Sequence, residues 1–186
     1  MSAQDSKLFV ISGPSGAGKG TLVTRVRERR SNLGLTVSAT TRAPRKGEVD
    51  GVNYFFLTRE EFDRRVANGE FVEWAEVHGN RYGTLVSEVQ SKLASGSSLI
   101  LEIDVQGALQ VKERFPEAVL IFIKPPSLEV LRERLVGRGT ETIELRMANA
   151  AHELALADRY DEVVVNDDLD RATDELVRVL DMHERI

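Results

Sequence analysis

The residues with the clearest chemistry in this chain lie in a glycine-rich segment near the N-terminus. The segment follows the apolar run 8–11, and its residues are Gly13, Pro14, Ser15, Gly16, Ala17, Gly18, Lys19, Gly20 and Thr21. A loop of this kind between a strand and a helix turns its backbone N–H groups inward, where they form a nest for phosphate oxygens. The helix dipole and the Lys19 ammonium add positive charge. We therefore predict a nucleoside triphosphate site rather than a simple connecting turn.

One position of this loop departs from the usual pattern, in which a serine or threonine follows the lysine and its hydroxyl binds Mg²⁺. Here Gly20 follows Lys19, and the hydroxyl comes one place later, at Thr21. Phosphate binding tolerates the change because it uses backbone N–H groups. The pattern therefore predicts a phosphate site but not direct Mg²⁺ ligation by the loop.

Two groups of basic residues outside the loop are also suited to phosphate. Arg42 and Arg45 lie three residues apart among hydroxyl side chains, a spacing that allows bidentate contacts. The second group, in and after a predicted helix, is Arg132, Arg134 and Arg138. Glycines flank the last of these, so it could swing over a transferring phosphate. Taken alone, the first group is better explained by a solvated basic turn, and the second equally well by a helix C-terminus.

Acidic and amide residues follow two of the predicted strands. Glu102 and Asp104 close a buried strand, where alternation would put both carboxylates on one face, suited to Mg²⁺ or its waters. The alternative is a helix cap at Asp104, which does not exclude the first role. Asn166 is placed either to touch a base or to brace a loop, and Asp168 to cap the last helix.

The elements that must position these residues alternate along the chain. Short apolar runs predict buried parallel strands at 8–11, 99–103, 119–123 and 163–165. Helical patterns occupy about 19–30, 105–114, 128–136, 142–157 and 169–184, and Ser127 suits an N-cap. This alternation predicts an α/β sheet covered on both faces, with its ligand at the carboxyl ends of the strands.

Residues 35–86 break the alternation. They contain a predicted edge strand at 36–38, an aromatic run at 53–57, a helix at 60–67 and an alternating strand at 71–77. Thr58 and Glu61 form a predicted capping box for that helix. We expect a small mixed β insertion over the ligand edge that can move as a lid, the alternative being a β extension without a ligand.

Composition limits the classes of function. The chain has 186 residues, with 41% apolar and 30% charged, as expected of one globular domain. A net charge of −5 argues against a broad attraction to nucleic acid, and the absence of cysteine removes disulfides and thiolate chemistry. The three histidines show no metal-ligand spacing. Without a signal-peptide pattern or a membrane-length apolar run, we expect a cytoplasmic protein with no membrane partner.

Taken together, these motifs resemble guanylate kinase. The resemblance includes Ser-Ala-Thr-Thr-Arg-Ala-Pro-Arg at 38–45 and Glu-Phe-Val-Glu-Trp-Ala at 70–75. The other matching segments are 12–19, 47–54, 79–84, 102–107, 137–141 and 165–169, so nearly the whole chain is covered in the family's order. The resemblance implies a three-layer P-loop NTPase fold with a central parallel sheet, a mixed β GMP-binding insertion and a helical lid.

The resemblance also implies a division of the single domain 1–186 and a reaction. The core would be 6–34, 87–125 and 158–186, the GMP-binding region about 35–86, and the lid about 126–157. The activity would be ATP-dependent phosphorylation of GMP to GDP with Mg²⁺, in purine nucleotide recycling. The partners would be ATP and GMP. Both a monomer and a homodimer remain open.

Site residues follow from the resemblance position by position. Residues 13–21 and Asn166 would bind ATP, and Glu102 and Asp104 would bind Mg²⁺ through water. The catalytic residues would be Lys19, Arg42, Arg134, Arg138 and Arg146. The GMP-binding residues would be Ser38, Arg42, Arg45, Tyr54, Glu73, Tyr82, Thr84 and Asp104. The Glu73 carboxylate could accept from guanine N1–H and the 2-amino group, a donor pair that adenine lacks.

Three other functions compete with this one. A catalytically inert guanylate-kinase-like module that binds proteins would tolerate loss of Lys19 or of the lid arginines, yet both are present. A regulatory GTPase would need an Asn-Lys-x-Asp segment, which the chain lacks. An AMP kinase is disfavoured by Glu73 and by the β character of the insertion.

Overall fold

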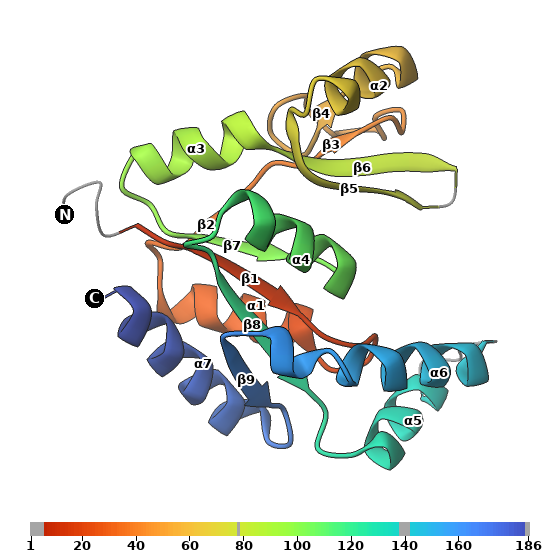
Figure 1. The fold of residues 1–186 in the computed structure, drawn as a ribbon, viewed down its shortest axis with the longest axis vertical. Helices are drawn as coiled ribbons and strands as arrows, with labels where there is room; N and C mark the ends of the chain where they lie inside the picture. The colour runs from red at the N-terminus through yellow and green to blue at the C-terminus, as the bar shows by residue number, and fades with distance from the viewer. Residues whose placement is uncertain (1–5, 78, 138–141, 185–186) are drawn as a thin grey trace.

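The structure is a computed structural model, which describes residues 6–77, 79–137 and 142–184. Its central sheet has five parallel strands in the order β2-β7-β1-β8-β9. The strands are β1 Leu8–Ser12, β2 Gly34–Leu35, β7 Leu99–Glu102, β8 Val119–Lys124 and β9 Glu162–Val165. Because the paired strands are parallel, the connections between them cross over the sheet and bring helices onto its faces, as Figure 1 shows.

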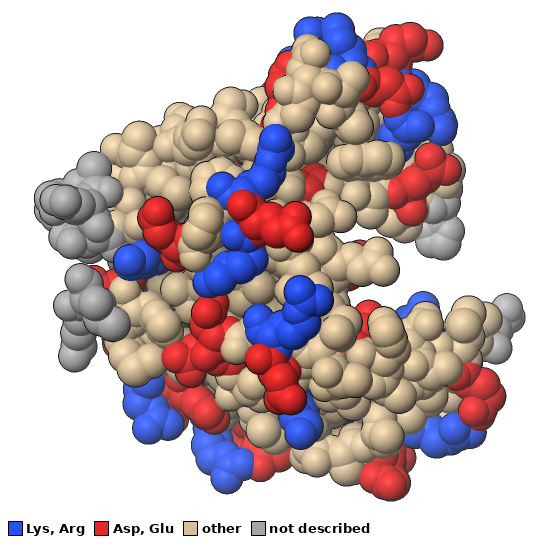
Figure 2. Space-filling view, in the orientation of Figure 1, with Lys and Arg blue, Asp and Glu red and all other residues tan. Residues whose placement is uncertain are grey.

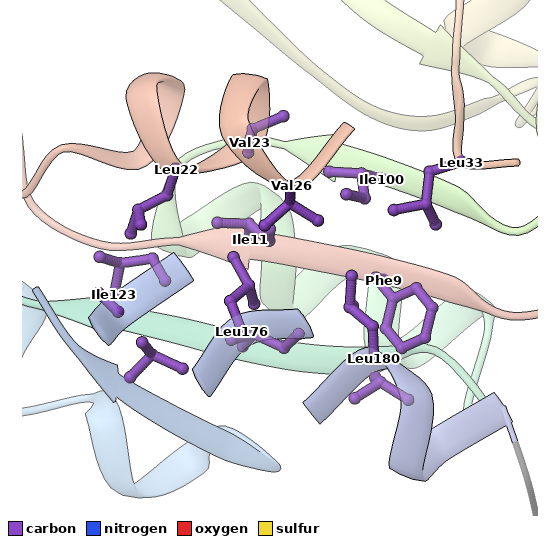
Figure 3. Packing of buried hydrophobic residues seen from close by; sticks show 14 of the residues in the cluster. Phe9, Ile11, Leu22, Val23, Val26, Leu33, Ile100, Ile123, Leu176 and Leu180 are labelled. Atoms are coloured by element: carbon purple, nitrogen blue, oxygen red, sulfur yellow. The ribbon is translucent and has the colours of Figure 1, made fainter. Parts of the chain in front are cut away.

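Both faces of β1 are buried, which explains its unbroken apolar run. Phe9 and Ile11 pack against α1 (Lys19–Arg29) and α7 (Leu169–Glu184), whose Leu176 and Leu180 lie beneath them in Figure 3. The alternate strand residues pack on the opposite side with α3 (Val86–Ala94) and α4 (Val105–Arg114). The predicted three-layer α/β fold is confirmed.

A second, mixed sheet has the order β4-β3-β6-β5. Its strands are β3 Ala39–Thr40, β4 Phe55–Phe56, β5 Phe71–Val77 and β6 Asn80–Leu85. Helix α2 (Arg59–Ala67) covers it through Phe62, whose ring stacks on Phe71 with centroids 4.3 Å apart. Thr58 caps this helix through the Glu61 N–H at 3.1 Å, whereas the Glu61 carboxylate accepts from Arg64 and Arg65.

A helical pair, α5 (Leu128–Val136) and α6 (Ile143–Leu154), lies at the other side of the molecule from the second sheet (Figure 1). Its own small core contains Leu131, Leu135 and Ala150. Ser127 caps α5 through the Val130 N–H at 3.2 Å, as predicted. Figure 2 shows the surface deeply hollowed between this pair and the second sheet.

Two predicted elements were wrong in extent. Residues 36–38 are not a strand, because the Val37 N–H is taken by the Glu88 carboxylate at 3.0 Å and the segment connects the two sheets. The helix predicted to reach 157 ends at Leu154, and a 3₁₀ turn, Ala157–Arg159, follows. That turn directs Leu156 and Ala157 onto the core, so tertiary packing overrides the helix propensity of the alanines.

Helix α3 and strand β6 were not predicted as elements.

Acidic and basic side chains are interspersed over the face shown in Figure 2. Within the described ranges, no helix combines the length and apolarity that crossing a membrane requires.

Candidate active site

The glycine-rich loop leaves the carboxyl end of β1, the middle strand, and leads into α1. Gly18 has a φ of 92°, and a Cβ there would lie 2.3 Å from Nδ2 of Asn166. A Cβ at Gly13 would lie 2.2 Å from the Ile123 carbonyl oxygen. These positions accept only glycine, because both the backbone conformation and the space exclude a side chain. The loop is thus packed tightly against the ends of the neighbouring strands.

Asn166 braces this loop. Its side chain is only 5% exposed, and its Nδ2 donates to the Ala17 carbonyl at 2.8 Å. Of the two roles considered from the sequence, the structure shows the brace. Asp168 caps α7 through the Arg171 N–H at 2.9 Å, as expected.

Lys19 lies over the loop, where its Nζ donates to the carbonyls of Gly13 at 2.6 Å and Pro14 at 3.1 Å. Its positive charge also acts on Glu153 of α6. Burial raises the pKa of Glu153, the Lys19 charge opposes that rise, and the Asp104 carboxylate adds to it. Lys19, Glu153 and Asp104 therefore share one charged neighbourhood.

Glu153 was not selected from the sequence. Its helix presents Arg146, Asn149 and Glu153 at spacings of three and four, a polar stripe that could have identified it. Arg146 also reaches the loop, with its Nη1 donating to Ser15 Oγ at 2.8 Å.

The arginines of the second basic group, Arg132, Arg134 and Arg138, do not all lie at the loop. Arg134 points to the loop region and donates to the Asn166 carbonyl at 2.9 Å. Arg132 instead forms an exposed ion pair with Glu144, which ties α5 to α6. Arg138 lies outside the described residues.

The carboxylates expected to bind Mg²⁺ do not both lie on a strand. β7 ends at Glu102, so the expected alternation does not extend to Asp104, which instead caps α4 through the Gly107 N–H at 2.7 Å. Glu102 faces the loop, and a Cβ at Gly20 would lie 3.7 Å from its Oε1. In the part of the chain that the structure describes, no three metal-ligating side chains come together.

Glu73 and Thr84 face each other across β5 and β6, with Thr84 Oγ1 donating to Glu73 Oε1 at 2.8 Å. Burial raises the pKa of Glu73, and the Asp104 carboxylate raises it further, while the hydrogen bonds from Thr84 oppose the shift. The Asp104 carboxylate thus acts electrostatically on both Glu73 and Glu153, and it lines a cavity together with Glu153.

Arg42 is held in the second sheet's aromatic cluster. Its guanidinium lies 5.3 Å from the Tyr54 ring centroid and donates to Glu48 at 2.9 Å. That hydrogen bond raises the pKa of Arg42 and lowers the pKa of Glu48. Tyr82 completes the cluster, edge-on to Tyr54 at 6.1 Å between centroids.

Glu48, which the sequence did not single out, also accepts from the Arg45 backbone N–H at 2.7 Å. The Arg45 side chain is exposed, and Ser38 is half-buried in the connection between the sheets, where its carbonyl accepts from the Phe55 N–H at 2.9 Å.

Two cavities flank this charged neighbourhood. One of about 340 Å³ lies between α4 and α6 and is lined by Asp104, Gln106, Asn149 and Glu153 among others. The second, about 220 Å³, lies on the other side of the loop, and its lining includes Gly16, Thr21, Arg134 and Asn166. The second cavity therefore lies directly at the loop and reaches Leu169 at the start of α7, whereas the first is enclosed by α4 and α6.

The strand order, with a phosphate-type loop after the middle strand, makes this a P-loop NTPase fold. A family model of guanylate kinase matches residues 5–183. The guanylate kinase of Gloeobacter violaceus is 56% identical over 178 residues, which cover 94% of this chain and 87% of the relative. That of Halalkalibacterium halodurans is 51% identical over 183 residues, covering 97% and 90%. The chain therefore belongs to the guanylate kinase family, and it is a nucleoside monophosphate kinase.

A solved structure agrees with this assignment. The crystal structure of guanylate kinase from Anaplasma phagocytophilum matches with a TM-score of 0.72 at 37% sequence identity. The match covers 96% of this chain and 86% of that one.

Proposed function

We propose that this chain transfers the γ-phosphoryl group of ATP to GMP, with the donor on the glycine-rich loop and the acceptor against the second sheet. The observation that carries the proposal is the position of Asp104, which caps α4 at the edge of the central sheet, lines a cavity together with Glu153, and acts electrostatically on Glu73 of the second sheet. A nucleotide bound at each side would therefore direct its phosphates into the same hollow.

Guanine recognition is assigned to Glu73. Its ionised carboxylate accepts from guanine N1–H and the 2-amino group, while Thr84 fixes the carboxylate by its hydrogen bond. Adenine has no such donor pair, so it would leave a half-buried charge unpaired. Ser38 and Asp104 supply further polar groups at this side.

The GMP phosphate is assigned to Arg42, Arg45, Tyr54 and Tyr82. Glu48 orients Arg42 before the phosphate arrives, because it holds one edge of the guanidinium by a hydrogen bond. The Arg45 side chain is exposed and is assigned a second charge-assisted contact to the same phosphate.

Phosphoryl transfer rests on alignment and charge neutralisation, since the acceptor phosphate is already ionised and requires no general base. Lys19 and Arg146 approach from the loop side and Arg134 from α5. Arg138 is assigned the same role. Together these cations stabilise the charge that spreads over the transferred group.

Mg²⁺ fits the carboxylates on this edge. Glu102 faces Gly20, and Asp104 lies two residues further along the chain as the N-cap of α4, so both are suited to hold the water ligands that Mg²⁺ retains. When bound, the ion neutralises charge on the triphosphate. Because Gly20 has no side chain, this task is assigned to Glu102 rather than to a hydroxyl at position 20.

We assign residues 35–86 to GMP binding and 126–157 to a lid, on a core of 6–34, 87–125 and 158–186, in a cytoplasmic enzyme. Closure of the two regions would exclude water and suppress ATP hydrolysis. An inert protein-binding module is disfavoured, because Lys19, Arg134 and Arg146 all converge on the loop.

A coupled assay of ADP formation tests the proposal. With ATP and Mg²⁺, GMP should be the preferred acceptor over AMP, UMP and CMP, and dGMP should be used because the assigned contacts spare the ribose 2′ position. Equal rates with AMP and GMP would contradict the assignment of Glu73.

Arg45→Ala should raise the KM for GMP by about tenfold and leave the KM for ATP unchanged, since it removes one charge-assisted contact to the acceptor phosphate. Steady-state kinetics with each substrate varied in turn measure this. Lys46→Ala, which removes a neighbouring exposed cation, is the control and should change neither constant by more than about twofold. Equal rises for GMP and ATP would place Arg45 elsewhere.

As the pH is lowered, GMP binding should weaken at a higher pH than it would if Glu73 had the pKa of an ordinary carboxyl group. The pKa of Glu73 is raised, so its ionised, hydrogen-bond-accepting form begins to disappear at a higher pH. The KM for GMP should therefore increase as the pH falls. The GMP phosphate also titrates near a pH of about 6. Comparison with Glu73→Gln separates the two effects, because only the phosphate titration should remain in that variant. Identical pH profiles for both proteins would remove Glu73 from guanine recognition.

A further inference from the structure

Arg114, the last residue of α4, connects the core to the second sheet. Its Nη1 donates to the carbonyl of Phe71 at the start of β5. Gly69 leaves room for the guanidinium, since a Cβ at that position would lie 3.0 Å from Nη2. Arg114 was not among the residues selected from the sequence, because a lone arginine at a helix C-terminus is explained by the helix dipole.

Open space lies on both sides of this arginine. It lines a cavity of about 430 Å³ together with Leu93 and Phe115, and a second of about 290 Å³ together with Trp74 and Gln110. The Arg114 side chain therefore crosses a gap between α4 and the second sheet. Figure 1 shows α4 lying between β5 and the central sheet.

The hydrogen bond from Arg114 reaches β5 where the strand's pairing with β6 is irregular. The register between β5 and β6 shifts between Phe71 and Glu73, which marks a β-bulge. A bulge re-aims the side chains that follow it. Here Phe71 packs in the core of the second sheet, Val72 packs in the core of the central sheet, and Glu73 faces Thr84. Arg114 thus holds the carbonyl from which this change of direction begins.

The opposite end of α4 lies at the same site. Asp104 caps the first turn of the helix, and its carboxylate is one of the charges that act on Glu73. One rigid helix therefore carries Asp104 at its N-terminus and, at its C-terminus, the arginine that holds β5 two residues before Glu73. The separation of these two carboxylates depends on both ends.

We infer that Arg114 is a positioning residue for the guanine site: by holding the Phe71 carbonyl it fixes the β5 bulge and so the direction of Glu73 opposite Thr84. This inference rests on the proposed role of Glu73. It extends that role to a residue that touches neither nucleotide.

Arg114→Met tests the inference, because methionine keeps an apolar stem and removes the donors. The KM for GMP should rise by about tenfold, the loss expected for one charge-assisted hydrogen bond. The kcat and the KM for ATP should stay within about twofold of the parent. Arg114→Lys restores one donor and should recover much of the GMP affinity. Arg178→Met, on the exposed side of α7, is the matched control and should change nothing.

A double variant separates this inference from the proposed function. If Arg114 acts through Glu73, adding Arg114→Met to Glu73→Gln should raise the KM for GMP by less than about twofold further. Fluorescence of Trp74, the only tryptophan, gives GMP binding independently of turnover.

Each other outcome counts against the inference. If Arg114→Met has a normal KM for GMP while Glu73→Gln binds GMP more weakly, the inference is overturned and the assignment of Glu73 to guanine is unaffected. No effect in either variant overturns the guanine assignment as well. Equal losses in GMP affinity, ATP affinity and melting temperature would mean that Arg114 only stabilises the fold.

Discussion

Lys19→Ala should lower kcat by roughly 10²–10³-fold while the protein stays folded, the loss typical of removing one donor to a transition-state oxyanion. The ammonium lies over the loop, within hydrogen-bond distance of the Gly13 and Pro14 carbonyls, and no other cation on the loop can replace it. Its charge is needed most when negative charge spreads over the transferred group, so turnover should suffer more than ATP binding.

Three measurements decide the result for Lys19. The coupled assay gives kcat, and circular dichroism and the melting temperature report the fold. Lys92→Ala, on α3 and away from the loop, should behave as the parent. A Lys19→Ala enzyme within about tenfold of normal kcat would remove the loop lysine from the mechanism.

Glu73→Gln should lower kcat/KM for GMP by about 10²-fold, because an amide cannot accept from both guanine donors without exposing its own N–H groups to one of them. The kcat/KM for IMP, which lacks the 2-amino group, should fall less, so the preference for GMP over IMP should nearly vanish. Glu76→Gln is the control, since Glu76 lies on the same strand with its carboxylate exposed and paired with Arg59. An unchanged GMP/IMP ratio would refute the assignment.

The same substitution should not weaken the fold. The pKa of Glu73 is higher in the folded state than in the unfolded chain, so its contribution to stability is complete at low pH and falls as the pH rises through the folded pKa. Removing the ionisable group should therefore keep or raise the melting temperature at pH 7, with the difference shrinking toward pH 4. A large loss of stability at pH 7 would show that Glu73 supports the sheet rather than the ligand.

Much of this arrangement follows from local sequence patterns. The apolar run before Gly13 and the helical pattern after Lys19 define the loop, and the two-sided burial of β1 follows from its unbroken apolar composition. Ser127 and Asp168 cap the helices that they precede, because short polar side chains at those positions satisfy free N–H groups.

The missed features depend on contacts between distant segments. Glu88 takes the N–H of Val37 and ends the expected strand there, a contact across 51 residues that no local pattern contains. The apolar pattern of α3, with Val86, Val89 and Leu93 on one face, is present in the sequence. It directly follows the motif at 79–84, which drew attention to ligand contacts rather than to secondary structure. Arg114 acts through the Phe71 carbonyl, 43 residues earlier in the chain, which only folding brings near.

A single ligand tests the central claim most directly. Adenosine and guanosine joined 5′ to 5′ through five phosphates would span both sites if the phosphates of the two nucleotides meet in one hollow. We predict a 1:1 complex by calorimetry, with binding at least about 10²-fold tighter than that of either mononucleotide, and inhibition competitive with both ATP and GMP. A ligand that competes with only one of them, while the other still binds its own site unhindered, would contradict the account.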